Sequence, residues 1–166
     1  MPIFGLNNGL VPIVSFNYGA RHRERMERAV RLAYITAEVI MIIGLAIFQL
    51  VPDKLLFLFG GSADMLSIGV PALRIISTSF LFAGIAIVSS SVCQALGRGM
   101  YSLAVSFGRQ IVVLVPAAFL LSRLGQLNLV WLAFPIAEVA SIILALFFVR
   151  RTIRHLDWTR RTEETA

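Results

Sequence analysis

The chain has 166 residues, 58% of them hydrophobic and 14% charged, with a formal net charge of +6. Soluble domains are about 25% charged, whereas the mean hydropathy here is +0.83, so the composition excludes disorder and is typical of a membrane protein. The single cysteine, Cys93, excludes a disulfide scaffold and a cysteine-based metal site, and we expect it to be a small packing residue. The arginines and lysines lie between apolar runs, a pattern of membrane topology rather than of nucleic-acid binding.

Long apolar segments predict about five transmembrane helices. A helix needs about 20 apolar residues to cross the hydrocarbon core, and continuous runs favour helices over the alternating strands of a barrel. The predicted spans are 2–20, 32–51, 75–96, 101–121 and 129–149. The expected fold class is therefore all-α, a polytopic membrane helix bundle over residues 1–150, followed by a basic tail over 151–166.

Two arginine-rich segments set the expected orientation. The connector 21–31 and the tail after Val149 hold most of the arginines, so both are predicted to be cytoplasmic, including the C-terminus. Between them, the connectors 52–74 and 122–128 are predicted to lie outside, and the apolar stretch 54–61 predicts a short interfacial helix. Setting the topology accounts for these arginines; binding to anionic lipid head groups is the other interpretation.

Three blocks of the sequence resemble a known family. They are GLNNGLVPIVSFNYGA at 5–20, CQALGRGMYSL at 93–103 with FGRQI at 107–111 and Pro116, and WLAFPIAE at 131–138. In this order and at this spacing they are similar to the end of the eighth helix, the junction of the tenth and eleventh, and the start of the twelfth in the multidrug and toxic compound extrusion (MATE) transporters.

The resemblance implies a twelve-helix fold of two six-helix bundles, of which this chain is the C-terminal portion. The N-terminal bundle and the seventh helix are then partners missing from the sequence. The implied function is cation-coupled antiport of cationic, amphipathic drugs or metabolites by alternating access, with Na⁺ or H⁺ as coupling ion and no other cofactor. The implied location is the cell membrane, the inner membrane of a bacterium.

Glu138 is the first candidate site residue. It lies near the middle of a predicted span, where an acidic residue costs about 2.5 to 3.5 kcal/mol, so a cavity or a partner is expected. Its interpretations are proton or cation coupling, attraction of cationic drugs, or a structural carboxylate bonded to a neighbouring helix. Asn8, Asn17 and Gln94 are candidates for lining a polar cavity, with packing as their alternative.

Two prolines and one arginine are candidates for shaping the helices. Pro135 and Pro116 each remove a backbone donor within a predicted span, so each predicts a bend. Arg109 is predicted to anchor its helix at the membrane interface. A salt bridge from Arg109 to Glu138 or Glu38 is the alternative.

Gly5 and Gly9 form a GxxxG pair, which predicts close packing of this helix against another. Glu38 lies about two turns into its span, and its expected partners are the connector arginines, Arg31 first among them because it lies on roughly the same helical face.

Nothing in the sequence predicts an enzyme. His22 and His155 lie in basic segments without metal-ligand spacing, and no nucleophile motif or nucleotide-phosphate loop is present. The energy for transport would therefore come from an ion gradient or from another subunit. The alternative functions are a truncated, non-transporting membrane protein or assembly partner, and a flippase for lipid or polysaccharide precursors.

Overall fold

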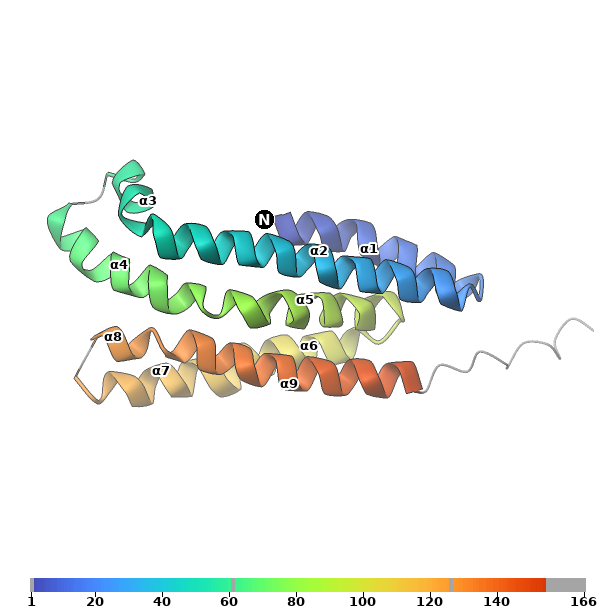
Figure 1. Ribbon diagram of the computed structural model, residues 1–166. Coiled ribbons are helices and arrows are strands. Elements are labelled where there is room, and N and C mark those ends of the chain that lie inside the picture. Colours follow the sequence, from blue (N-terminus) through green and yellow to red (C-terminus); the bar gives the residue numbers. More distant parts are fainter. Residues whose placement is uncertain (1, 61, 126, 155–166) are drawn as a thin grey trace, which may run out of the picture.

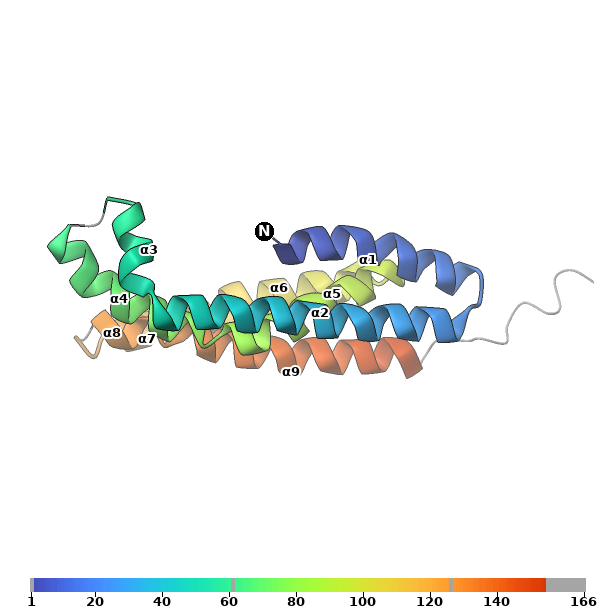
Figure 2. The same cartoon turned by 45° about the horizontal axis from the view of Figure 1, so that its top comes forward.

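The computed structural model describes residues 2–60, 62–125 and 127–154. In chain order the elements are α1 (Pro2–Gly19), α2 (Arg23–Leu50), α3 (Pro52–Leu58), α4 (Ala63–Ser77), α5 (Phe80–Ala95), α6 (Gly99–Phe107), the π-helix η1 (Gly108–Leu114), α7 (Val115–Ser122), α8 (Leu127–Val130) and α9 (Ala133–Arg154). The long helices lie side by side along one direction, while α3 and α4 project from one end of the bundle (Figures 1 and 2). The all-α fold class predicted from the sequence is confirmed.

Three helical stretches are long and apolar enough to cross a membrane: 23–50, 99–122 and 128–154. A fourth span exists if α4 and α5, which meet at a bend of 52°, are taken as one. These four coincide with the last four predicted spans, whereas α1, which contains Pro12, is not among them. The described part of the predicted tail, 151–154, continues α9, and the rest of the tail, with His155, lies outside the described residues.

The predicted third span, 75–96, is two helices rather than one. The break falls at residues 78 and 79, and α4 extends back to Ala63, through residues predicted to belong to a connector. Ser77, Thr78 and Ser79 bond their hydroxyls to carbonyls three residues earlier, at 3.0, 2.6 and 2.6 Å. Such bonds compete with the helical ladder, so three in a row account for the break. The helix predicted within 54–61 is present as α3, and its place at a membrane interface stays a prediction.

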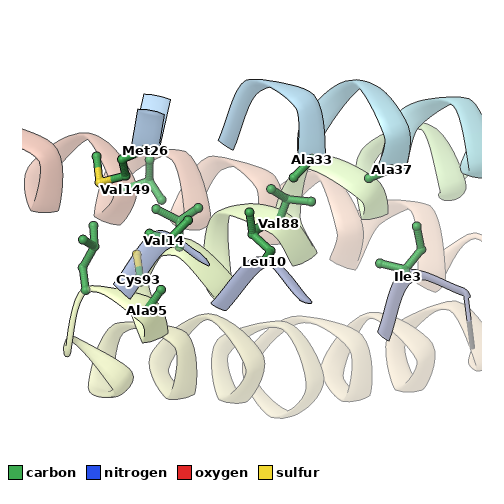
Figure 3. Packing of buried hydrophobic residues seen from close by; sticks show 12 residues of the cluster. Ile3, Leu10, Val14, Met26, Ala33, Ala37, Val88, Cys93, Ala95 and Val149 are labelled. Carbon is green, nitrogen blue, oxygen red and sulfur yellow. The ribbon is translucent and has the colours of Figure 1, made fainter. Parts of the chain in front are cut away.

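The helix α5 lies at the centre of the bundle. It packs against α1, α2, α6 and α9, and its buried residues are mostly Ala, Ser, Gly, Val and Cys, small side chains that let membrane helices approach closely. The buried apolar cluster in Figure 3 joins α5 through Val88 and Cys93 to Val14 of α1, Met26 of α2 and Val149 of α9. Cys93 is 1% exposed, which confirms its predicted packing role.

The contact between α2 and α5 depends on Gly84. A Cβ at this position would lie 2.6 Å from Oε1 of Glu38 and 3.3 Å from Cγ of Met41, so only glycine leaves room for the carboxylate. The predicted pairing of Glu38 with Arg31 is wrong, because Glu38 points toward α5, where its Oε1 is buried and has no hydrogen-bond partner within the described ranges. Arg31 is exposed instead.

The face of α1 that enters the bundle differs from the prediction. Its buried positions are Ile3, Asn7, Leu10 and Val14, whose spacing of three or four residues defines one side of the helix. Gly5 and Gly9 therefore lie on the other side, and a Cβ at either would meet nothing within 4 Å. The close helix approach predicted from this GxxxG pair is wrong among the described helices.

The contrast between these glycines gives a testable prediction. Replacing Gly84 by alanine is expected to destabilise the protein by about 1 to 3 kcal/mol, because the Glu38 carboxylate and Met41 must move. The matched change Gly9→Ala is expected to be neutral or slightly stabilising, because it gains helix propensity without a clash. Thermal unfolding of the purified variants measures both changes in stability. If the Gly9→Ala protein melts at a lower temperature than the Gly84→Ala protein, the tight helix contact lies on α1 instead.

The two candidate prolines mark local changes of helix geometry. Pro116 follows η1, in which the N–H of Val115 bonds to the carbonyl of Gln110, five residues back. Pro116 has no N–H and its ring crowds the carbonyl four residues earlier, so the wider π turns accommodate it. Pro135 lies in the first turn of α9, after a turn at 131–132. Pro135 has no N–H to bond to the carbonyl of Trp131, which suits its place just after this turn. The stretch 128–154 counts as one helix, so the bend predicted for Pro135 stays a prediction.

Candidate functional site

A polar cavity of about 300 Å³ lies between α1, α5, α6, η1 and α9. Its lining side chains are Phe4, Asn7, Asn8, Val11, Ala86, Ile87, Ser90, Ser91, Gln94, Ser102, Val105, Ser106, Arg109, Glu138 and Ser141. Amide, hydroxyl and charged groups thus meet between helices whose buried residues are mostly apolar. Polar groups gathered at membrane depth are costly and mark binding or ion pathways in membrane proteins.

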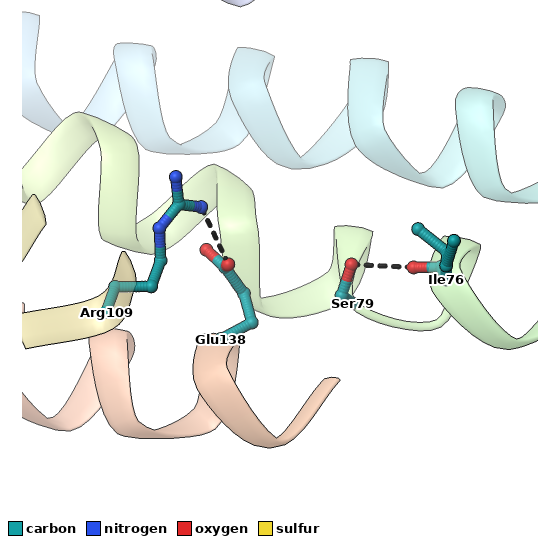
Figure 4. A network of polar contacts seen from close by, with 4 residues as sticks. All are labelled: Ile76, Ser79, Arg109 and Glu138. Atoms are coloured by element: carbon teal, nitrogen blue, oxygen red, sulfur yellow. Dashed lines mark hydrogen bonds and ion pairs between the residues drawn. The ribbon is translucent and has the colours of Figure 1, made fainter. Parts of the chain in front are cut away.

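The charged pair of the cavity is Arg109 with Glu138. Nη1 of Arg109 donates to Oε2 of Glu138 at 2.9 Å, from η1 to α9 (Figure 4). The Glu138 side chain is 6% exposed, whereas that of Arg109 is 40% exposed. The salt bridge stated as the alternative for Arg109 is therefore the arrangement found. Arg109 reaches into the bundle because the carboxylate there compensates its charge, and its predicted anchoring role is replaced by this contact.

The salt bridge to Arg109 involves only one of the two carboxylate oxygens of Glu138. Oε1 of Glu138 is buried and has no hydrogen-bond partner among the described residues, and the same holds for Oδ1 of Asn7. A buried acceptor without a donor costs about 1 to 3 kcal/mol. Two such oxygens in the lining of one cavity favour an occupant that donates hydrogen bonds or carries positive charge.

The turn from α5 to α6 brings two lining residues of the cavity, Gln94 and Ser102, together. Gly97 adopts a φ of +74°, and the N–H groups of Gly97 and Arg98 bond to the carbonyls of Gln94 and Cys93, which ends α5 in a left-handed cap that favours glycine. The chain reverses here, so Gln94 Nε2 donates to Ser102 Oγ of α6 at 2.8 Å.

Three of the four predicted cavity residues line the same space. Glu138, Gln94 and Asn8 meet there, together with Arg109, although they are spread over most of the sequence. Asn17 is not part of it, because its Nδ2 donates to the carbonyl of Ile13 at 2.8 Å within α1. The cavity prediction for Asn17 is therefore wrong.

Several polar residues of the cavity were not among the predicted site residues. They are Asn7, Ser90, Ser91, Ser102, Ser106 and Ser141. A signal was available, because Ser102, Ser106 and Arg109 have the spacing i, i+4, i+7, and Ser141 lies three residues after Glu138, so each group shares a helical face with its charged member.

The fold and the cavity together define a polytopic membrane helix bundle with a polar site at its centre. The family model described as MatE matches residues 1–120, which is more than half of the chain. The chain therefore belongs to the MatE family, and the resemblance predicted from the sequence is confirmed.

Curated relatives carry the name of an export protein. The multidrug export protein MepA of Staphylococcus haemolyticus is 26% identical over 148 residues, which are 89% of this chain and 32% of the relative. MepA of Staphylococcus aureus is 24% identical over 148 residues, with the same coverage. The chain thus spans about a third of the length of the curated relatives it matches.

Solved structures share the fold. The MATE multidrug transporter DinF-BH is 34% identical with a TM-score of 0.83, over 91% of this chain and 34% of that one. An inward-facing conformation of a multidrug resistance MATE family transporter is 24% identical with a TM-score of 0.86, over 96% of this chain and 37% of that one. The second likeness concerns the fold alone.

Proposed function

We propose that this chain is the C-terminal part of a multidrug efflux transporter, corresponding to helices eight to twelve, and forms one wall of its path for cationic, amphipathic compounds. The observation that carries the proposal is the buried carboxylate of Glu138, with one oxygen paired to Arg109 and the other without a partner among the described residues. The names of the relatives support it, since MepA is a multidrug export protein and DinF-BH is a MATE multidrug transporter.

The chemistry of the cavity suits a cation with an apolar body. A positively charged substrate group competes with Arg109 for Glu138, and the Arg109 side chain, which is 40% exposed, is not enclosed by the described helices and can move away from the carboxylate. Phe4, Val11 and Ile87 supply apolar contacts on the other walls. A coupling ion, H⁺ or Na⁺, acts in this proposal by competing for the same carboxylate, so that its entry releases the substrate.

The proposal is tested by transport in cells. The intact gene product, expressed in a bacterial strain that lacks its own multidrug pumps, is expected to lower accumulation of a cationic fluorescent dye, and dissipating the Na⁺ or H⁺ gradient separately identifies the coupling ion. Unchanged accumulation with the protein present in the cell membrane would favour the non-transporting alternative.

A steric variant tests the cavity itself. Replacing Ser106, which lines the cavity, with tryptophan is expected to reduce dye efflux several-fold, because the indole occupies much of the available space. The matched variant Phe107→Trp changes the neighbouring residue, which is 53% exposed and does not line the cavity, and is expected to retain efflux. Equal efflux by the two variants, at equal amounts in the membrane, would show that substrates do not pass through this space.

A further inference from the structure

The outward face of α9 carries a groove that plays no part in the cavity. Its lining residues are Ile143, Leu146, Phe147, Arg150, Arg151 and Arg154, along a groove of about 590 Å³. Their spacing of three or four residues places them on one side of the helix. The buried residues of the same stretch are Ser141, Ala145, Val149 and Thr152, so the groove lies on the opposite side, facing away from the bundle.

The groove is apolar along one part and positively charged at one end. Ile143 and Phe147 are 63% and 56% exposed and form an apolar floor. One turn further on, three arginines follow at the end of α9, where none of them forms an ion pair within the described part of the chain. Three uncompensated guanidinium groups beside an exposed apolar surface therefore lie at one end of the bundle.

Within residues 2–154, the neighbouring segments that the structure describes do not neutralise this charge. The N-terminal part of α2 lies at the same end of the bundle (Figure 1); it contributes Arg25, and the turn before it contributes Arg21. The two carboxylates of this part of α2, Glu24 and Glu27, already face Arg28 and Arg23 at 4.0 and 2.6 Å. An occupant of the groove thus meets positive charge at one end and hydrocarbon-like surface at the other.

We propose that this groove binds one anionic phospholipid, with its phosphate on Arg150, Arg151 and Arg154 and an acyl chain along Ile143 and Phe147. Arginine recognises phosphate through paired hydrogen bonds. The apolar floor suits a lipid acyl chain, whereas a free phosphate would leave this floor uncovered. The site lies on the face opposite Glu138, so it is independent of the proposed transport function.

Native mass spectrometry of the intact gene product in detergent tests the site. With phosphatidylglycerol and phosphatidylcholine of the same acyl chains, the protein is expected to retain phosphatidylglycerol preferentially. Each arginine near an anionic lipid surface is worth about fivefold in binding, so the triple variant R150Q/R151Q/R154Q is expected to weaken phosphatidylglycerol binding by more than tenfold. The matched variant R21Q/R25Q/R28Q removes the same charge outside the groove and is expected to leave most of the binding.

Other outcomes would overturn the proposal. Equal losses in the two triple variants would show a diffuse charge effect, and retention of both lipids alike would show that no such site exists. Preference for phosphatidylglycerol only after deletion of residues 156–166 would make the chain's own tail, which holds Asp157, Glu163 and Glu164, the occupant. If the triple variant does not fold, R151Q alone is expected to lose about fivefold, and I143Q is expected to weaken binding without altering its dependence on salt.

Discussion

Replacing Arg109 with glutamine is expected to destabilise the protein by about 3 kcal/mol, because it leaves the carboxylate of Glu138 buried without a countercharge. The reverse change, Glu138→Gln, is expected to cost less, since the Arg109 side chain is 40% exposed whereas that of Glu138 is 6% exposed. The double variant R109Q/E138Q is expected to recover most of the stability, because both charges are then gone. Thermal unfolding of the purified variants in one detergent measures the order.

The expected order of melting temperatures is therefore wild type, then E138Q and the double variant, then R109Q. Arg109→Lys serves as the control, because it keeps the charge and is expected to melt closer to wild type than R109Q. If R109Q costs as much in the E138Q background as in the wild type, the two side chains do not interact. The wild type, the two single variants and the double variant form a double-mutant cycle, which isolates the interaction free energy between the two side chains.

The convergence of Glu138, Gln94 and Asn8 could be predicted from residue type, because polar side chains in apolar helices need a shared environment. The bond between Arg109 and Glu138 could be named only as an alternative, with Glu38 as an equal candidate. These residues are 29 positions apart on different elements, and no periodicity in one helix reports which face of another it meets. Only the packing of η1 against α9 brings the two charges together.

The sequence alone also does not show which face of α1 is buried or where the third predicted span breaks. The GxxxG pair on α1 indicates small residues at one face, but the burial of Ile3, Asn7 and Leu10 places the opposite face inward. The side chain of Asn17 bonds to a carbonyl of its own helix and does not line the cavity, and its residue type is compatible with either position. The break before α5 arises from consecutive hydroxyl groups at 77–79, each of which is common within a helix when it occurs alone.

Glu138→Gln is expected to reduce efflux of cationic dyes by at least thirtyfold in the intact gene product. Removing one partner of a buried charge contact costs about 2 kcal/mol or more, which corresponds to about thirtyfold in affinity. A neutral amide neither attracts a cationic substrate nor exchanges it for H⁺ or Na⁺. Dye efflux from cells, measured across external pH and at matched amounts of protein in the membrane, gives the result.

Two further variants distinguish the effect of the Glu138 charge from the effect of side-chain shape in the cavity. Glu138→Asp keeps the carboxylate and is expected to retain part of the efflux, and Ser141→Ala, one turn away on the same cavity face, is expected to retain nearly all of it. Because E138Q is expected to remain folded and to melt only a little below the wild type, lost transport with this small change in melting temperature would assign the carboxylate to substrate or ion binding. Efflux and pH dependence unchanged in E138Q would instead make Glu138 a structural partner of Arg109, and the cation would have to be bound elsewhere in the transporter.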